Sequence, residues 1–253
     1  MKKSKLVLLQ FYCLILYTSG LTIFTDKNVH FVWSNDVGLE NAVKTIEIAN
    51  GNMFHPKLKY ILNKTSQQKN TSDKFKALWI NNTINTHIPQ ILEEFKNITD
   101  VRIENTDLSQ FDENVLKRLT NIKRLYLGRN IIGEVTRDAL TKLIHLEILC
   151  LNNNKINSLD DRTLERTTEL RKINLSYNNL KEISSDLFSN NRQLQEIYLE
   201  GNKLQIIAEN AFENLNLKAL TLAWNDCIDM STFSYEKNIN ELLLEVRENC
   251  KKN

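Results

Sequence analysis

Aromatic and basic side chains recur through this chain at a nearly constant spacing. Trp79, Arg102, Tyr126 and Tyr198 fall on one series of positions with steps of 23 or 24 residues, and Arg124 lies two residues before Tyr126. Tryptophan, tyrosine and arginine often anchor protein interfaces, because they bury a large area and keep a polar group. We therefore predict that these five residues bind a protein partner. The alternative is that the aromatic residues are present only because they favour β-strands.

A cysteine occupies the same series. Cys150 follows Tyr126 by 24 residues. Cys227 lies three repeats further along the chain, which is too far away for a disulfide with Cys150. In an oxidising compartment an exposed thiol tends to be bridged to another chain or capped. We therefore consider two states for Cys150: an intermolecular disulfide that makes a dimer, and a reduced or capped thiol in a monomer.

The sequence contains no motif of an enzyme. It lacks Gly-x-Ser-x-Gly, a phosphate-binding loop, His-Glu-x-x-His and a calcium-loop pattern. We therefore predict that the protein is not an enzyme and uses no cofactor and no metal.

The constant spacing comes from a repeat that organises most of the chain. Its pattern is Leu-x-x-Leu-x-Leu-x-x-Asn-x-Leu, with Ile at some positions, and it occurs three times without a gap between residues 146 and 204. Corner residues at positions 51, 83, 106, 130, 154, 178, 202 and 225 mark eight coils. The alternation in each coil predicts a strand, with Leu149 and Leu151 turned inward and Cys150 outward. An asparagine at the corner can satisfy backbone groups of the turn and of the next coil.

This pattern and its 24-residue period resemble those of leucine-rich-repeat proteins. The resemblance implies an α/β fold: a right-handed solenoid with a concave parallel sheet of about eight strands, mostly coil or short helical turns on the convex side, and a helical C-terminal cap. One coil cannot bury its apolar face alone, so neighbouring coils stack, and the concave face is left for partners. Five large apolar residues recur on the convex side and should pack under the sheet: Leu116, Leu140, Leu164, Phe188 and Phe212.

The chain divides into four predicted regions. They are a secretory signal peptide (1–20), an N-terminal cap (21–42), the repeats (43–225, with a polar insertion at about 58–74) and a C-terminal cap (226–253). The signal peptide is indicated by lysines before an apolar run and by small residues near its end. In the two caps, residues 29–33 read as a strand and residues 235–248 as a helix.

Cleavage of the signal peptide makes the net charge nearly zero. It removes Lys2, Lys3 and Lys5 and no acidic residue, so Lys+Arg falls from 33 to 30 against 31 Asp+Glu, a net charge of −1. Binding to nucleic acid requires a clustered basic face, for which the sequence gives no sign. No second long apolar run follows the signal peptide. We therefore predict a secreted, extracellular protein with no nucleic-acid partner and no membrane span.

Sequons indicate that the protein is glycosylated. The acceptor asparagines are Asn63, Asn70, Asn81, Asn97 and Asn174. Because Asn174 lies on the outward series, a glycan there would cover the C-terminal half of the concave face. The partner-binding site would then narrow to Trp79, Arg102, Arg124 and Tyr126.

Secretion favours disulfides, and we expect Cys227 and Cys250 to tie the cap helix to the final coil. This pairing is similar to the C-terminal cysteine cap of secreted and cell-surface leucine-rich-repeat proteins. The chain is also similar to short secreted leucine-rich-repeat proteins of insects, including the mosquito leucine-rich immune proteins that act in complement-like defence. The resemblance implies a protein-recognition module in innate immunity. Two alternatives stay open: a salivary or venom decoy or inhibitor, and an extracellular matrix or adhesion protein.

Overall fold

The computed structural model describes residues 21–26, 29–34, 44–49, 75–81, 97–109, 113–231 and 238–251, with side chains from residue 97 onward. The predicted signal peptide (1–20) and the predicted insertion (58–74) lie outside the described residues. So do two of the predicted glycosylation sites, Asn63 and Asn70.

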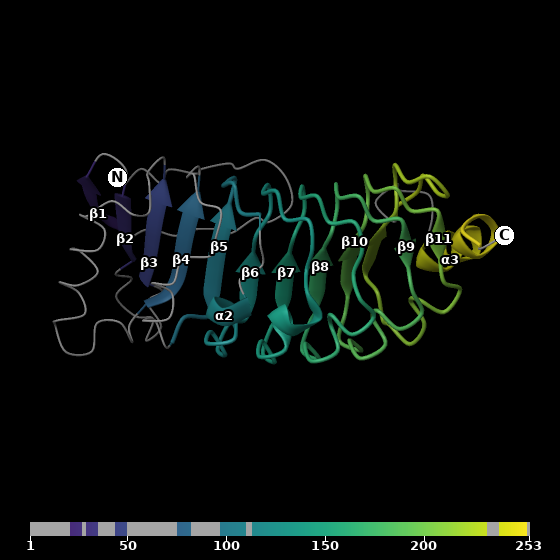
Figure 1. Cartoon of the computed structure of the whole chain (residues 1–253), viewed down its shortest axis with the longest axis horizontal. Helices are drawn as coiled ribbons and strands as arrows, with labels where there is room; N and C mark the ends of the chain where they lie inside the picture. Colours follow the sequence, from purple (N-terminus) through teal and green to yellow (C-terminus); the bar gives the residue numbers. More distant parts are fainter. Residues whose placement is uncertain are drawn as a thin grey trace, which may run out of the picture.

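Ten strands form one continuous sheet along the solenoid. Eight of them pair in parallel, one from each coil, in the order β3, β4, β5, β6, β7, β8, β10 and β12. Figure 1 shows the strands from β3 to β10 side by side along the solenoid. Their bounds are Lys44–Ala49, Phe75–Asn81, Asp100–Glu104, Arg124–Tyr126, Ile148–Cys150, Lys172–Asn174, Glu196–Tyr198 and Ala219–Thr221. The predicted parallel sheet of about eight strands is therefore confirmed.

Two antiparallel strands extend the sheet at its N-terminal edge. The strand predicted over residues 29–33 is β2 (Val29–Ser34), which pairs with β3. The outermost strand, β1 (Leu21–Asp26), was not predicted and pairs with β2. Its threonine and isoleucine residues favour extended backbone, so an edge position on an existing strand suits it.

The apolar core lies between the sheet and the convex side. From β5 onward, where side chains are described, the inward residues of the parallel strands, such as Leu125 and Leu149, are fully buried. The five convex residues predicted to pack under the sheet are also buried, and Phe188 stacks on Phe212 with ring centroids 6.1 Å apart. The convex side consists of turns and short elements, as predicted: α2 (Glu113–Leu116), the 3-10 helix η3 (Arg137–Leu140), and a small ladder of β9 (Glu182–Ile183) and β11 (Ile206–Ile207).

Corner asparagines join each coil to the coil before it. Four of them make the same set of bonds: Asn154, Asn178, Asn202 and Asn225. Asn130 makes the same two bonds to carbonyl oxygens, but its oxygen accepts from the amide and the hydroxyl of Thr106. In Asn178 the side-chain amide donates to the carbonyl oxygens of Leu151 and Leu175, both at 3.0 Å, and its oxygen accepts from the amide of Ile156 at 3.0 Å. The bonds therefore reach the preceding coil, whereas the sequence predicted the next one.

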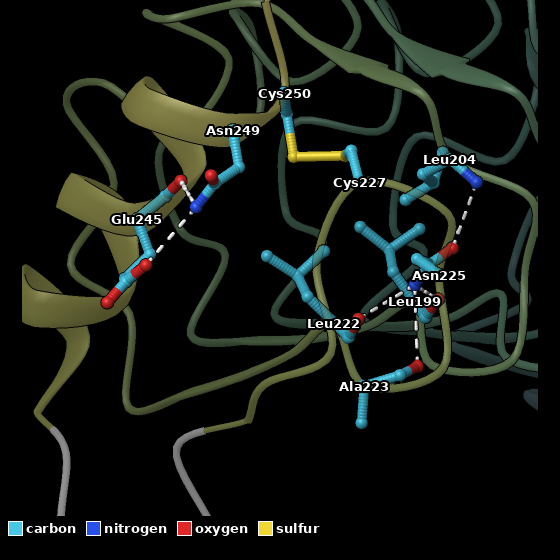
Figure 2. Close-up of a disulfide and its surroundings, with 9 residues drawn as sticks. All are labelled: Leu199, Leu204, Leu222, Ala223, Asn225, Cys227, Glu245, Asn249 and Cys250. Atoms are coloured by element: carbon cyan, nitrogen blue, oxygen red, sulfur yellow. Dashed lines mark hydrogen bonds between the residues drawn. A yellow bond between two sulfur atoms is a disulfide. The ribbon is translucent and has the colours of Figure 1, made fainter.

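The C-terminal cap is a helix held by a disulfide. Helix α3 spans Ile239–Asn249, and it begins later than predicted because the Asn238 side chain caps it by accepting from the amide of Glu241. Residues 235–237 of the predicted helix lie outside the described residues. Cys250, at the end of α3, is bonded to Cys227 of the final coil (Figure 2), so the expected disulfide is present.

Candidate functional site

The sheet brings the predicted outward residues into one row. Backbone register places Trp79 beside Arg102, and Arg102 beside Tyr126. The row continues through Cys150 and Asn174 to Tyr198. Three of the predicted partner-binding residues are therefore neighbours on β4, β5 and β6, whereas Tyr198 lies three strands further along. The side chain of Trp79 lies outside the described part of the chain.

The two tyrosines of this row are covered by cations from the same face. Tyr126 is 4% exposed, and the Arg102 guanidinium lies 4.5 Å from the centre of its ring. Tyr198 is 6% exposed, and the Lys172 ammonium lies 4.7 Å from its ring centre. These distances suit cation–π contacts. An incoming protein would therefore meet the cations before the rings.

Ion pairs between neighbouring coils fix a second row of charged side chains. Arg124 on β6 bonds to Asp100 on β5 through two nitrogens, and the hydrogen bond with Asp100 raises the pKa of Arg124. Lys123 donates to Glu147 at 2.9 Å, which lowers the pKa of that carboxyl. The side chains of Lys123 and Arg124 remain about half exposed, so they are available for contact.

A three-residue network surrounds Tyr198. Lys172 and the Tyr198 hydroxyl both donate to Glu196, at 2.7 and 2.8 Å. Burial and the bond to Glu196 together raise the pKa of Tyr198 to about 12. Burial works to raise the pKa of Glu196, but the bonds from Lys172 and Tyr198 outweigh it and lower that pKa. Glu196 is thus held ionised and Tyr198 neutral, an arrangement that orients the cation over the ring.

The prediction that the Cys150 thiol is exposed is wrong. Cys150 does lie on the outward row between Tyr126 and Asn174, but its exposed fraction is 0%. The backbone register agrees with the predicted alternation, but the alternation does not fix how much of a short side chain its surroundings leave exposed. The exposed thiol on which the intermolecular disulfide was based is absent, so that dimer loses its basis.

Burial predicts how Cys150 reacts. In the native protein a maleimide should leave the Cys150 thiol unmodified, because the reagent has no access to the sulfur; in denaturant it should modify Cys150 fully. Mass spectrometry of the peptide that contains Cys150 measures both states. Rapid modification of the native protein would contradict the burial of this thiol.

The sequon at Asn174 is also buried. The Asn174 side chain is 2% exposed and accepts a hydrogen bond from the amide of Ser176 at 3.0 Å. A glycan on this side chain would need the space now filled by its neighbours. Asn97, by contrast, is partly exposed. Asn81 is described only as a backbone position at the end of β4.

Two exposed aromatic residues were missed by the sequence analysis. Tyr177 and Trp224 are 41% and 63% exposed, and their ring centroids are 6.1 Å apart. Each precedes a corner asparagine, and this is the sequence signal that could have identified them. That position turns outward at the edge of the concave face with positive φ, 55° at Tyr177 and 58° at Trp224.

Within the described residues, no group of three or more His, Cys, Asp or Glu side chains is placed to hold a metal ion. In the same part of the chain, no helix has both the length and the apolar character needed to cross a membrane.

The stacked coils with their parallel sheet have the leucine-rich-repeat fold. The family model described as leucine rich repeat matches residues 120–180 and 168–226. No curated protein sequence matches the chain.

Solved structures share the fold. The chain is similar to TLR13 in its complex with ssRNA13, at 21% identity and a TM-score of 0.62, over 72% of this chain and 28% of that chain. It is also similar to a chain of the Toll–Spatzle complex from Drosophila, at 22% identity and a TM-score of 0.55, over 68% of this chain and 26% of that chain. The chain thus spans little more than a quarter of either relative.

Proposed function

We propose that this chain is a non-enzymatic recognition module that binds a protein partner on the concave face. The observation that carries the proposal is the pair of partly exposed cations at the start of β6, Lys123 and Arg124, each held by a carboxylate. Lys123 and Arg124 are held in place by Glu147 and Asp100 of the neighbouring coils. Charged side chains held in this way lose little conformational freedom on binding, which lowers the cost of forming an interface.

The proposed binding surface is centred on Arg124. On the neighbouring strand β5, Arg102 pairs with Tyr126 and its guanidinium covers that ring, and Trp79 continues the row on β4. Tyr198 contributes through Lys172, which covers its ring. The predicted residues thus take part in two ways: the cations make contact, and the tyrosines support them from below.

The charge pattern favours a protein over a nucleic acid. Arg124, Lys123 and Lys172 are each paired with a carboxylate of a neighbouring coil. A nucleic-acid surface gains its affinity from cations that are free to neutralise phosphates. A face of alternating charges suits a partner that carries both signs.

We place the protein outside the cell, with innate immunity as its setting. The predicted signal peptide supports secretion, and so does the Cys227–Cys250 disulfide, because such bonds persist in oxidising compartments. The immune setting rests on the resemblance to insect leucine-rich immune proteins. The Toll–Spatzle complex is a molecular hub in Drosophila development and innate immunity.

Affinity capture from native extracellular fluid tests the proposed face. A double Lys123→Ala, Arg124→Ala variant should bind the captured protein about tenfold more weakly than the wild type, since interface arginines often contribute more than 1 kcal/mol. Arg137→Ala is the matched control, because Arg137 is equally exposed but lies on the convex side in η3.

The Arg137→Ala variant should bind as the wild type does. Equal binding by the wild type and the double variant would remove the contact from this part of the concave face.

A further inference from the structure

From β5 onward, one residue lies immediately before each parallel strand, and together these residues form a row along the edge at which the strands begin. We call it the pre-strand row, and its members are Thr99, Lys123, Glu147, Arg171, Gln195 and Lys218. From Lys123 onward, each backbone amide donates to the carbonyl oxygen of the member before it, at 2.7 to 2.9 Å. The row is therefore a regular ladder with one side chain per strand spacing, about 4.8 Å.

Positive charge occurs at every second step of the pre-strand row. Lys123, Arg171 and Lys218 are the cations, and Glu147 and Gln195 lie between them. Two strand spacings separate successive cations, a distance of about 9.6 Å. All three cationic residues are exposed. The row therefore presents positive charges to the solvent at a constant interval.

Two of the three cations are not bonded to a carboxylate. Glu147 is bonded to Lys123 at 2.9 Å, and this bond is the largest cause of the lowered pKa of Glu147. Arg171 adds only a weaker attraction to the same carboxyl. Within the described part of the chain, Arg171 and Lys218 form no ion pair and no side-chain hydrogen bond. An anion of a partner can therefore reach these two cations without breaking an existing pair.

The interval between the cations matches one conformation of a peptide. A polyproline II helix has three residues per turn and rises about 3.1 Å per residue, so side chains at i and i+3 point the same way about 9.3 Å apart. In a β-strand, residues three positions apart are separated by about 9.9 Å, but they point to opposite faces. In an α-helix, side chains seven positions apart are about 10.5 Å apart. Over the two intervals of the row, the mismatch is about 0.6 Å for polyproline II and about 1.8 Å for the α-helix.

We propose that the pre-strand row binds an acidic, extended segment of the partner protein, which has Asp or Glu at every third residue in polyproline II conformation. The three carboxylates meet Lys123, Arg171 and Lys218, and the Arg171 guanidinium can hold its carboxylate through two parallel bonds. The residues between them pass over Glu147 and Gln195, where basic or neutral side chains fit, so the segment carries both signs. This inference rests on the proposed recognition of a protein and specifies the segment of that protein.

The test is an NMR titration of the full chain with an acetylated and amidated peptide of three Glu-Pro-Pro units, followed through the backbone amide signals of the pre-strand row. Its prolines hold the polyproline II conformation. The matched probe has the same composition and charge, but its three glutamates are adjacent, between two runs of proline. At about 0.1 M salt, charges more than about 10 Å apart are largely screened, so mainly nearby charges contribute.

The Glu-Pro-Pro peptide should bind about fivefold more tightly than the matched probe. Adjacent glutamates reach one cation of the row at a time, so the matched probe loses two exposed ion pairs. Equal affinity for the two peptides would show that the row does not recognise the spacing of the carboxylates.

Two double variants locate the peptide. Arg171→Gln, Lys218→Gln should weaken binding of the Glu-Pro-Pro peptide about fivefold, because two exposed ion pairs are lost. Arg137→Gln, Lys203→Gln is the matched control, since it removes the same two charges from exposed residues that lie off the row. The control should bind the peptide as the wild type does.

Three results with these variants would overturn the proposal. Unchanged binding by Arg171→Gln, Lys218→Gln would place the peptide elsewhere. Equal losses in the two double variants would show that the peptide responds only to net charge. Binding of a sulfated oligosaccharide that depends on Arg171 and Lys218, without binding of the Glu-Pro-Pro peptide, would assign the row to a sulfated sugar chain.

The titration also separates this inference from the proposed function. If the Lys123→Ala, Arg124→Ala variant loses the captured protein but the wild type binds neither peptide, the acidic segment is wrong and the recognition of a protein stands. If the Glu-Pro-Pro peptide binds as expected but that variant keeps the captured protein, the row takes acidic segments and the proposed contact at Lys123 and Arg124 is wrong for that protein.

Discussion

Replacement of Asn178 by alanine should lower the free energy of unfolding by about 3 kcal/mol or more, since each buried backbone group left without its partner costs about 1–3 kcal/mol. The Asn178 side chain is 5% exposed and serves three such groups: the carbonyls of Leu151 and Leu175 and the amide of Ile156. Alanine can replace none of these bonds, and the surrounding coils exclude the water that could.

Asn179→Ala is the matched control for this variant. Asn179 is the next residue, it is partly exposed, and its backbone amide, which the substitution keeps, donates to Ile156. The same chemical change should therefore cost about 0.5 kcal/mol or less. Urea unfolding followed by circular dichroism measures both variants. Similar losses for the two would show that the corner bonds contribute little.

The effect of Asn178→Ala should also spread to neighbouring coils. In a solenoid each coil contacts only the coils beside it, so stability is close to a sum of coil and interface terms. Asn178 holds the interface between the coils of β7 and β8, in the middle of the described repeats. A weakened interface there can divide one cooperative unfolding transition into two. This would appear as a smaller slope of the free energy of unfolding against urea concentration.

The register of the sheet could be predicted because it depends only on the period. With one strand per coil and inward residues fixed by the apolar pattern, Tyr126 must lie beside Arg102 and Cys150. The direction of each side chain follows from the same alternation. Every predicted neighbour in the outward row therefore agrees with the structure.

Burial on the outward row could not be predicted in the same way. Alternation says that Tyr126 turns outward, but Arg102 covers its ring and leaves it 4% exposed. Whether a long side chain lies across its neighbour depends on its conformation and on a carboxylate such as Glu104 that holds it. These contacts join different coils, and the repeat pattern does not specify them. The burial of Cys150 also could not be inferred from the alternation.

The aromatic pair at the edge shows the same limit. Each of Tyr177 and Trp224 can be placed before a corner asparagine from the sequence alone. Their contact depends on the space at Gly201, one coil from each, where a Cβ atom would lie 2.6 Å from the Tyr177 ring. No single repeat contains all of these residues, so the pair becomes visible only once the coils are stacked.

Removal of the Cys227–Cys250 disulfide should destabilise the cap by about 3 kcal/mol, the loop-entropy estimate for a closed loop of 23 residues. The expected loss of stability is large for α3, because only Leu242 and Val246 of this helix are buried. Beyond the disulfide, the amide of Ile207 donates to the Cys250 carbonyl at 2.9 Å and ties the helix end to β11. A helix with so small an apolar face depends on a covalent link.

Amide hydrogen exchange of α3 in a Cys227→Ala, Cys250→Ala variant measures this loss, with urea unfolding alongside. A reducing agent provides the control: it should bring the wild type to the level of the variant and leave the variant unchanged. The loss should be largest in α3 and the final coil, and smallest near β5, because each coil contacts only its neighbours. Unchanged protection of α3 after reduction would mean that Leu242 and Val246 suffice to hold the helix, and that the disulfide only closes a chain already in place.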